Sequence, residues 1–172
     1  MIVLEFDSKD IDIAFEKAKE YNLENVDSVE FSKKLFVMPV HLRVDNVEML
    51  EMSVQYGRVV TEWPFLPIVD MASYGLEMVY DAWIHGQSEI WVSEIGLRLT
   101  LERDGDNINI QSHNMNRKCS VPYIELEHAF EDFAKTVKET LLKGAPELAK
   151  HSYWGGWFRG EVKTPWRDWK DE

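Results

Sequence analysis

The chain of 172 residues has very little cysteine: Cys119 is the only one, so no disulfide can form within the chain. A reducing compartment suits this composition best, and we expect a cytoplasmic protein. The longest apolar runs fall far short of the ~20 residues that a helix needs to cross a bilayer. The start, Met1 to Phe6, is followed by acids and lacks the pattern of a secretory signal. We therefore expect no membrane partner.

Familiar catalytic and nucleotide-binding motifs are also missing. The glycines stand singly at turns except Gly155-Gly156, so there is neither a Gly-x-Gly-x-x-Gly sequence nor a Walker loop. No serine lies in a Gly-x-Ser-x-Gly elbow, and no signature surrounds Cys119. The histidines lack the tight spacing of metal ligands. His128 shares a helix face with Glu131 and Asp132, which could hold a metal ion, but a solvent-exposed helix face would show the same pattern. We expect no catalytic residue, no cofactor and no metal.

Positive charge is scarce in the first three-fifths of the chain. Residues 1–105 hold twenty acids and nine bases, whereas residues 106–172 hold eleven and ten, which together give the net charge of −12. Such a field repels nucleic acid and speeds encounters with basic proteins. We therefore expect a basic protein partner and no nucleic acid. Solubility alone is the simpler explanation of the same excess.

The clearest pattern predicts a helix from Leu66 to His85. Its apolar residues step by three, four, three and four along one stripe: Val69, Ala72, Leu76, Val79 and Trp83. Pro67 suits the first turn of a helix, and Gly86 suits its end in a left-handed conformation. A second long helix is predicted over 125–143, with a stripe running from Leu126 to Leu141.

Alternating residues predict the strands. A hairpin over 97–111 turns at Asp104-Gly105-Asp106, residues 89–93 form a neighbouring strand, and residues 35–63 form a three-strand meander that turns at Asp45-Asn46. We also expect a helix over 10–22 with Ile13 on its inner face, and a polar loop over 112–118. Together these elements predict a single α+β domain over 1–172, in which a mostly antiparallel sheet (meander plus hairpin) packs on two long helices.

Two groups of residues are candidates for binding. Asp70, Tyr74, Glu77 and Asp81 share one face of the predicted central helix, and Glu89 and Glu94 follow closely, which favours an acidic ridge that contacts a basic partner. A solvated outer face would have the same spacing. The second group lies in the last part of the chain, 152–172, an irregular arm with four of the seven tryptophans, Trp154 and Trp157 among them. The arm would either contact a partner or fold back over the open side of the sheet.

The order of elements resembles small bacterial immunity proteins found beside polymorphic or contact-dependent toxins: a helix from Leu66-Pro67, a strand, the hairpin at Asp104-Gly105-Asp106, and a helix closing at Leu141-Leu142 and Pro146-Glu147-Leu148. The resemblance implies a cytoplasmic protein that binds and blocks one basic toxin. The alternative hypothesis is an enzyme or small-molecule-binding domain with a pocket between the sheet and the aromatic arm. A homodimer that exchanges its arms is a further possibility.

Overall fold

The protein combines two antiparallel sheets with helices packed against them. The computed structural model describes residues 1–50, 64–92 and 96–163. In the first sheet β2 lies between β1 and β3 and also pairs with β4; in the second the strand order is β5-β6-β7-β8. The strands are β1 (Ile2–Phe6), β2 (Val37–Val44), β3 (Val47–Glu48), β4 (Phe65–Pro67), β5 (Gln87–Val92), β6 (Leu97–Asp104), β7 (Asn107–Ser112) and β8 (Arg117–Pro122). The predicted α+β class with antiparallel strands is confirmed.

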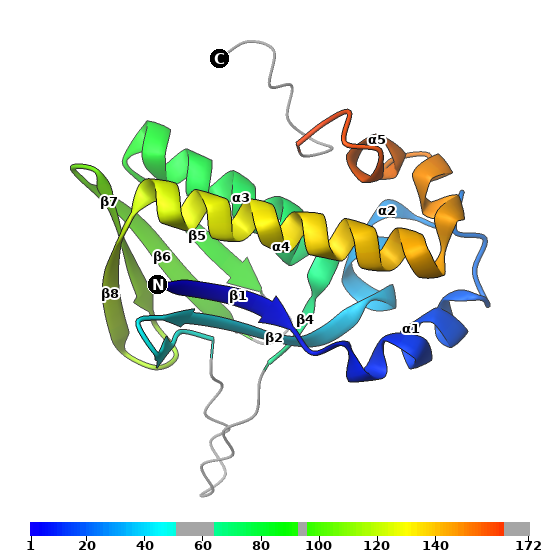
Figure 1. Ribbon diagram of the computed structural model, residues 1–172, viewed down its shortest axis with the longest axis horizontal. Helices are drawn as coiled ribbons and strands as arrows, with labels where there is room; N and C mark the ends of the chain where they lie inside the picture. The colour runs from blue at the N-terminus through cyan, green and yellow to red at the C-terminus, as the bar shows by residue number, and fades with distance from the viewer. Residues whose placement is uncertain (51–63, 93–95, 164–172) are drawn as a thin grey trace, which may run out of the picture.

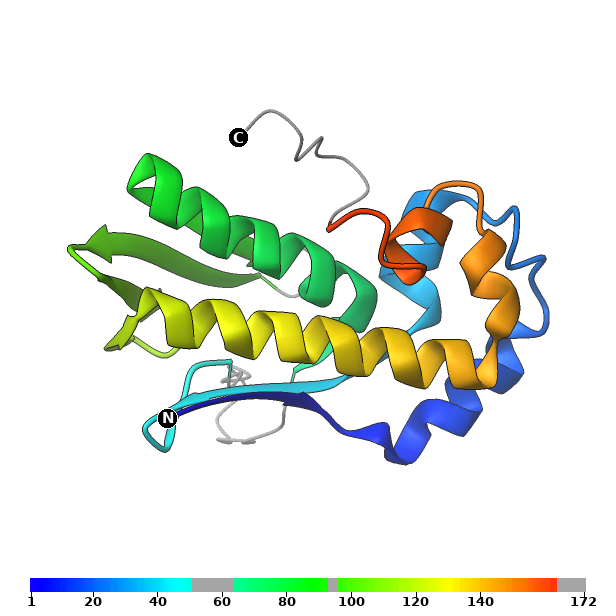
Figure 2. The same ribbon diagram turned by 45° about the horizontal axis from the view of Figure 1, so that its top comes forward.

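Two long helices lie side by side, with α4 beside β1 and α3 beside β5 (Figures 1 and 2). The shorter helices α1, α2 and α5 gather at one end of the molecule. The helical segments are η1 (Ser8–Asp10), α1 (Ile11–Ala18), α2 (Ser28–Glu30), η2 (Phe31–Leu35), α3 (Ile68–His85), α4 (Tyr123–Gly144), η3 (Pro146–Lys150) and α5 (Gly155–Phe158).

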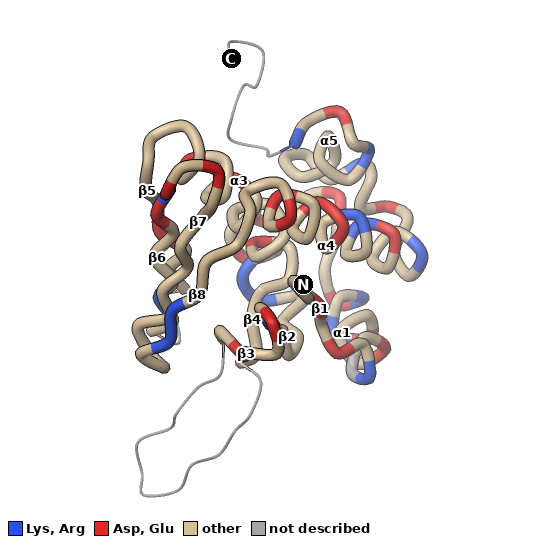
Figure 3. Tube along the Cα trace, turned by 60° about the vertical axis from the view of Figure 1, so that its left-hand side comes forward, with Lys and Arg blue, Asp and Glu red and all other residues tan. Residues whose placement is uncertain are grey.

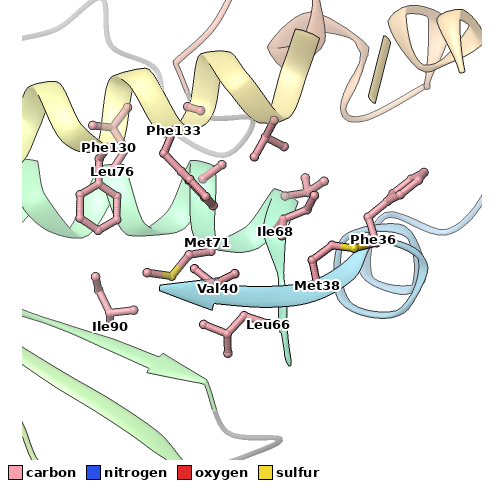
Figure 4. Packing of buried hydrophobic residues seen from close by; sticks show 14 of the residues in the cluster. Phe36, Met38, Val40, Leu66, Ile68, Met71, Leu76, Ile90, Phe130 and Phe133 are labelled. Atoms are coloured by element: carbon pink, nitrogen blue, oxygen red, sulfur yellow. The ribbon is translucent and has the colours of Figure 1, made fainter. Parts of the chain in front are cut away.

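The central helix α3 forms where the sequence predicts it. The first four residues of its predicted stripe are buried, and Trp83 is partly buried against the same core. Gly86 ends the helix with φ 87°, as expected of a left-handed cap. Pro67, however, precedes the helix and belongs to β4, where it pairs with Val37. Figure 4 shows Ile68 and Met71 of α3 near β2 in the centre of the core.

Both predicted tight turns are present. Gly105 has φ 62° between β6 and β7, and Asp45 and Asn46 have φ 48° and 68° between β2 and β3, the positive values that a two-residue hairpin loop requires. The third strand of the predicted meander, 58–63, lies outside the described residues. The loop predicted over 112–118 is correct only for residues 113–116, because Ser112 ends β7 and pairs with Arg117, which begins β8. Most residues of β8 are polar, so the sequence there shows no alternation of apolar and polar residues.

The helix predicted over 10–22 is also shorter than expected. It starts after the 3₁₀ turn η1, which the Asp7 carboxylate caps by accepting the Lys9 N–H, and it ends at Ala18. Ala14 and Ala18 are buried, whereas Ile13, which was predicted on the inner face, is exposed. The inner face also carries Ile11 and Phe15, which are partly buried against the core.

The described part of the arm, residues 152–163, is partly regular and packs on other helical segments rather than on a sheet. Within its described part, residues 155–158 form α5, and Trp154 and Trp157 are buried. Their rings pack with Phe31 of η2 and Phe158, and the Trp154 indole Nε1–H donates to the Ser28 carbonyl at 3.1 Å. Burial of these apolar side chains therefore holds the arm at the end of the molecule where the short helices lie.

Candidate functional site: the Trp91 groove

A surface groove of ≈ 390 Å³ lies where α2, η2, α3, β5 and the beginning of the aromatic arm meet. A narrow extension of ≈ 40 Å³ continues from it between β4 and β5 and shares four of its residues. We call it the Trp91 groove; its lining residues are Ser28, Val29, Ser32, Lys33, Asp70, Tyr74, Trp91, Tyr153 and Trp154. Segments that are far apart in the sequence thus form one concave surface.

Local hydrogen bonds hold the wall formed by α2. The Asp27 carboxylate accepts the N–H groups of Val29 and Glu30 at 3.0 and 3.1 Å, which satisfies two free donors of this helical turn. The Trp154 indole donates to the last carbonyl before Val29, that of Ser28. This wall is therefore fixed before any ligand arrives, which lowers the entropy cost of binding.

Large apolar side chains remain exposed around the groove. Trp91 is 61% exposed and Tyr153 is 43% exposed, and Val29 is also exposed beside them. In β5 the side chains alternate, so that Ile90 enters the core while Trp91 points outward. Exposed aromatic side chains gathered at a hollow are typical of interaction sites, whereas isolated ones are common on any surface.

The floor of the groove is electronegative. Tyr74 donates its hydroxyl hydrogen to the Glu89 carbonyl at 3.3 Å. Burial raises the pKa of Tyr74, and the nearby carboxylates of Glu77, Glu89, Asp81 and Asp70 raise it further, in that order. Four of the five predicted acids therefore act on one phenol. These carboxylates favour a cation near Tyr74, whereas Lys33, which lines the same groove, opposes one.

These acids differ in how much surface they offer. Glu77 is 9% exposed and so contributes mainly through its field. Asp81 lies 3.9 Å from His85 Nε2, and Glu89 forms an ion pair with Arg98 at 2.7 Å on the neighbouring strand. Asp70 lines the groove itself, together with the exposed Lys33. Asp70 is thus the acid best placed to contact a ligand.

Over the rest of the surface, charge of both signs is spread widely. Figure 3 shows acidic residues on helices and strands of both sheets, with basic residues among them, in the part of the chain that the structure describes. Among the described residues, the acidic excess is therefore not concentrated on a single face. The electronegative environment of Tyr74 is a local feature, and it coincides with the groove.

The predicted binding residues thus separate into distinct groups. Asp70 and Trp154 line the groove, and the other acids described above surround Tyr74. Trp157 is fully buried, with the Lys138 ammonium 4.5 Å from its ring centre, so it forms part of the core. Glu94 lies outside the described residues. The pocket proposed between sheet and arm therefore has a counterpart, lined by Trp154 but not by Trp157.

Trp91, Tyr153 and Lys33 were missed as site residues. Alternation in the predicted strand over 89–93 was a usable signal for Trp91, because a residue next to the core-facing Ile90 must point outward. No comparable signal existed for Lys33 or Tyr153, since they reach the groove only through the packing of η2 and the arm against α3.

Other groups with chemical potential lie away from the groove. His41 Nδ1 contacts the Glu48 carboxylate at 2.5 Å, and burial lowers the pKa of His41 more than Glu48 raises it. Cys119 lies beside the Met49 sulfur at 3.8 Å. In the described ranges no three histidine, cysteine or acidic side chains are arranged to hold a metal ion. None of the helices in those ranges is long and apolar enough to span a membrane.

Comparisons with protein-family models, with curated proteins and with solved structures find no match to this chain. The resemblance to immunity proteins remains a prediction from the order of elements. The function must therefore be argued from the groove.

Proposed function

We propose that this protein is a binding protein that recognises a basic protein partner through the Trp91 groove and the carboxylates around it. The observation that carries the proposal is the coincidence of exposed aromatic surface, at Trp91 and Tyr153, with an electronegative floor at Tyr74. Aromatic residues supply most of the energy of many protein interfaces, and charges steer the encounter and select the partner.

The biological role that we propose is inhibition of a basic toxin in the cytoplasm. The order of elements from the central helix to Leu148 supports it, as does the acidic composition. An inhibitor of this kind needs no catalytic group of its own, because it acts by covering a surface of its target. Electrostatic attraction would speed capture of the toxin, which is the property such an inhibitor needs most.

Titration against the purified products of neighbouring genes tests the proposal. We expect one basic partner to bind with an affinity that falls as salt is raised, because surface charges are screened over about 8–10 Å at physiological salt. Asp81→Lys and Glu89→Lys should weaken this binding by slowing association. Glu125→Lys, a charge reversal at an exposed acid on α4, is the matched control. Binding that is unaffected by salt and by both groove-side reversals would contradict the proposal.

A small-molecule-binding domain is the second candidate. The observation in its favour is the volume of the groove, ≈ 390 Å³, which is within the range of ligand pockets. A screen of small cationic and aromatic compounds by thermal shift addresses it. A compound that stabilises the protein at micromolar concentration, combined with no binding to any basic protein, would favour this second function.

A further inference from the structure

We propose that the Trp91 groove holds one arginine side chain of the protein partner, with its guanidinium beside the Asp70 carboxylate and its plane against the exposed rings of Trp91 and Tyr153. This inference rests on the proposed function and specifies the chemistry of that same site. It assigns roles to Trp91, Tyr153 and Lys33 that the acidic ridge alone would not.

The lining residues favour a planar cation over other ligands. Asp70 supplies the carboxylate, and Tyr74, Ser28 and Ser32 add polar groups around it. Trp91 and Tyr153 supply exposed aromatic rings, one from β5 and the other from the arm. A guanidinium stacks on aromatic rings and forms paired hydrogen bonds with a carboxylate, while its weak hydration makes transfer into a groove less costly than for an ammonium.

An anionic or purely apolar ligand fits these residues less well. The field of four carboxylates at Tyr74 opposes an anion. A purely apolar group would cover Asp70 and exclude water from its carboxylate without adding a hydrogen-bond donor, which is unfavourable. A cationic head on an apolar stem meets both requirements, because the stem can cover the aromatic side chains while the head stays near the carboxylate.

Lys33 provides a test in which the direction of the change in affinity distinguishes a cationic from an anionic ligand. Its exposed side chain lines both parts of the groove, as Asp70 does. Its positive charge therefore acts against an incoming arginine. Neutralising Lys33 should tighten binding, whereas neutralising Asp70 should weaken it. A groove that bound an anion would give the opposite sign for both changes.

The probe is a short peptide with one arginine between apolar residues, compared with the same peptide carrying citrulline, which keeps the shape and loses the charge. Binding is followed by NMR through the indole N–H signal of Trp91, assigned with Trp91→Phe. We expect saturable shifts with the arginine peptide, and Asp70→Asn should weaken binding about tenfold or more, the effect of one charge-assisted hydrogen bond. Lys33→Gln should strengthen it several-fold, as expected of removing a like charge near the surface.

Trp91→Ala lacks this indole signal, so its binding is measured by isothermal titration calorimetry, and it should also weaken binding of the arginine peptide. Its matched control, Phe65→Ala, is measured in the same way. Phe65 is another aromatic residue on a strand, 53% exposed, which does not line the groove. Circular dichroism of each variant verifies that the fold is intact. Equal binding of the citrulline peptide, or no effect of Asp70→Asn, would overturn the inference.

The outcome also separates this inference from the proposed function. If a basic partner binds in a salt-dependent way and responds to Asp81→Lys and to Trp91→Ala but not to Asp70→Asn, the arginine site is wrong and the proposed function stands. If the arginine peptide binds as predicted but no basic protein does, the site is correct and the proposed function fails. A lysine peptide that binds more tightly than the arginine peptide would overturn the assignment of the side chain.

Discussion

The imidazole of His151 accepts a hydrogen bond from the backbone N–H of Trp154, 3.1 Å from its Nδ1 atom, and a second one from the N–H of Tyr153 at 3.0 Å. Both donors belong to residues that line the Trp91 groove. His151 is 3% exposed and packs against the ring of Phe31. The neutral imidazole thus accepts backbone N–H groups as the side chain of a capping aspartate or asparagine does at a helix N-terminus. It fixes the position of the arm relative to η2.

We predict that His151→Ala destabilises the protein by about 2 kcal/mol, because two buried or partly buried N–H groups lose their acceptor. His151→Asn should cost less, since its amide oxygen can accept the same two hydrogen bonds. Urea denaturation of the two variants measures the difference. If the alanine variant were as stable as the asparagine variant, the two hydrogen bonds would contribute nothing to stability.

The same histidine makes stability depend on pH. Burial lowers the pKa of His151 below its ordinary value of 6.5, although the backbone carbonyl of Val26 partly opposes this shift. The unfolded chain therefore takes up a proton more readily than the folded protein as the pH falls below 6.5. The free energy of unfolding should decrease from that pH downward, until the lower pKa of the folded state is reached.

His41 contributes with the same sign, because burial also lowers its pKa. His151→Asn should therefore reduce the acid sensitivity below pH 6.5 without removing it. Denaturation midpoints measured over this range for the wild type and the variant give the contribution of His151. An unchanged dependence on pH in the variant would show that the imidazole of His151 titrates normally.

Cys119 should react slowly with thiol reagents in the folded protein. Burial raises the pKa of its thiol to about 11. The reactive thiolate is then rarer at neutral pH than in an ordinary cysteine by roughly a hundredfold, and the reaction rate should fall accordingly. Stopped-flow labelling with a disulfide reagent measures this rate, and the urea-unfolded chain provides the control. Equal rates in the folded and unfolded protein would contradict the prediction.

How much of this architecture the sequence reveals depends on the range of the interactions involved. The stripes of α3 and α4 and the turn at Gly105 follow from local periodicity and from a single backbone requirement, and all three were predicted. The strand β8 was not predicted, because Arg117, Lys118 and Ser120 are polar and only pairing with β7 reveals the strand. Local rules identify an element when its own residues carry the pattern.

Only part of the groove could be predicted from the sequence, for the same reason. Asp70 lies on a recognisable helix face, and Trp91 sits at an outward strand position. Whether they meet depends on how β5 lies against α3, and on where the arm docks. The arm docks through Trp154 and Phe158 on Phe31, contacts between residues more than a hundred positions apart. The composition of the arm gave its apolar character but not its location.

The close approach of α3 and α4 provides the last prediction. At Gly75 a methyl group would lie 2.5 Å from the Phe130 ring, much closer than carbon atoms can approach. Gly75→Ala should therefore destabilise the protein by about 2 kcal/mol through overpacking, even though alanine favours a helix more than glycine does. Gly156→Ala is the control, because a methyl group there would meet its nearest neighbours at 3.6 and 3.7 Å, which is ordinary contact. Thermal unfolding should show a lower midpoint for the first variant and an equal or higher one for the second. If Gly75→Ala were stabilising, the two helices would have to separate at little cost, and the packing between them would be looser than the contact of Gly75 with Phe130 implies.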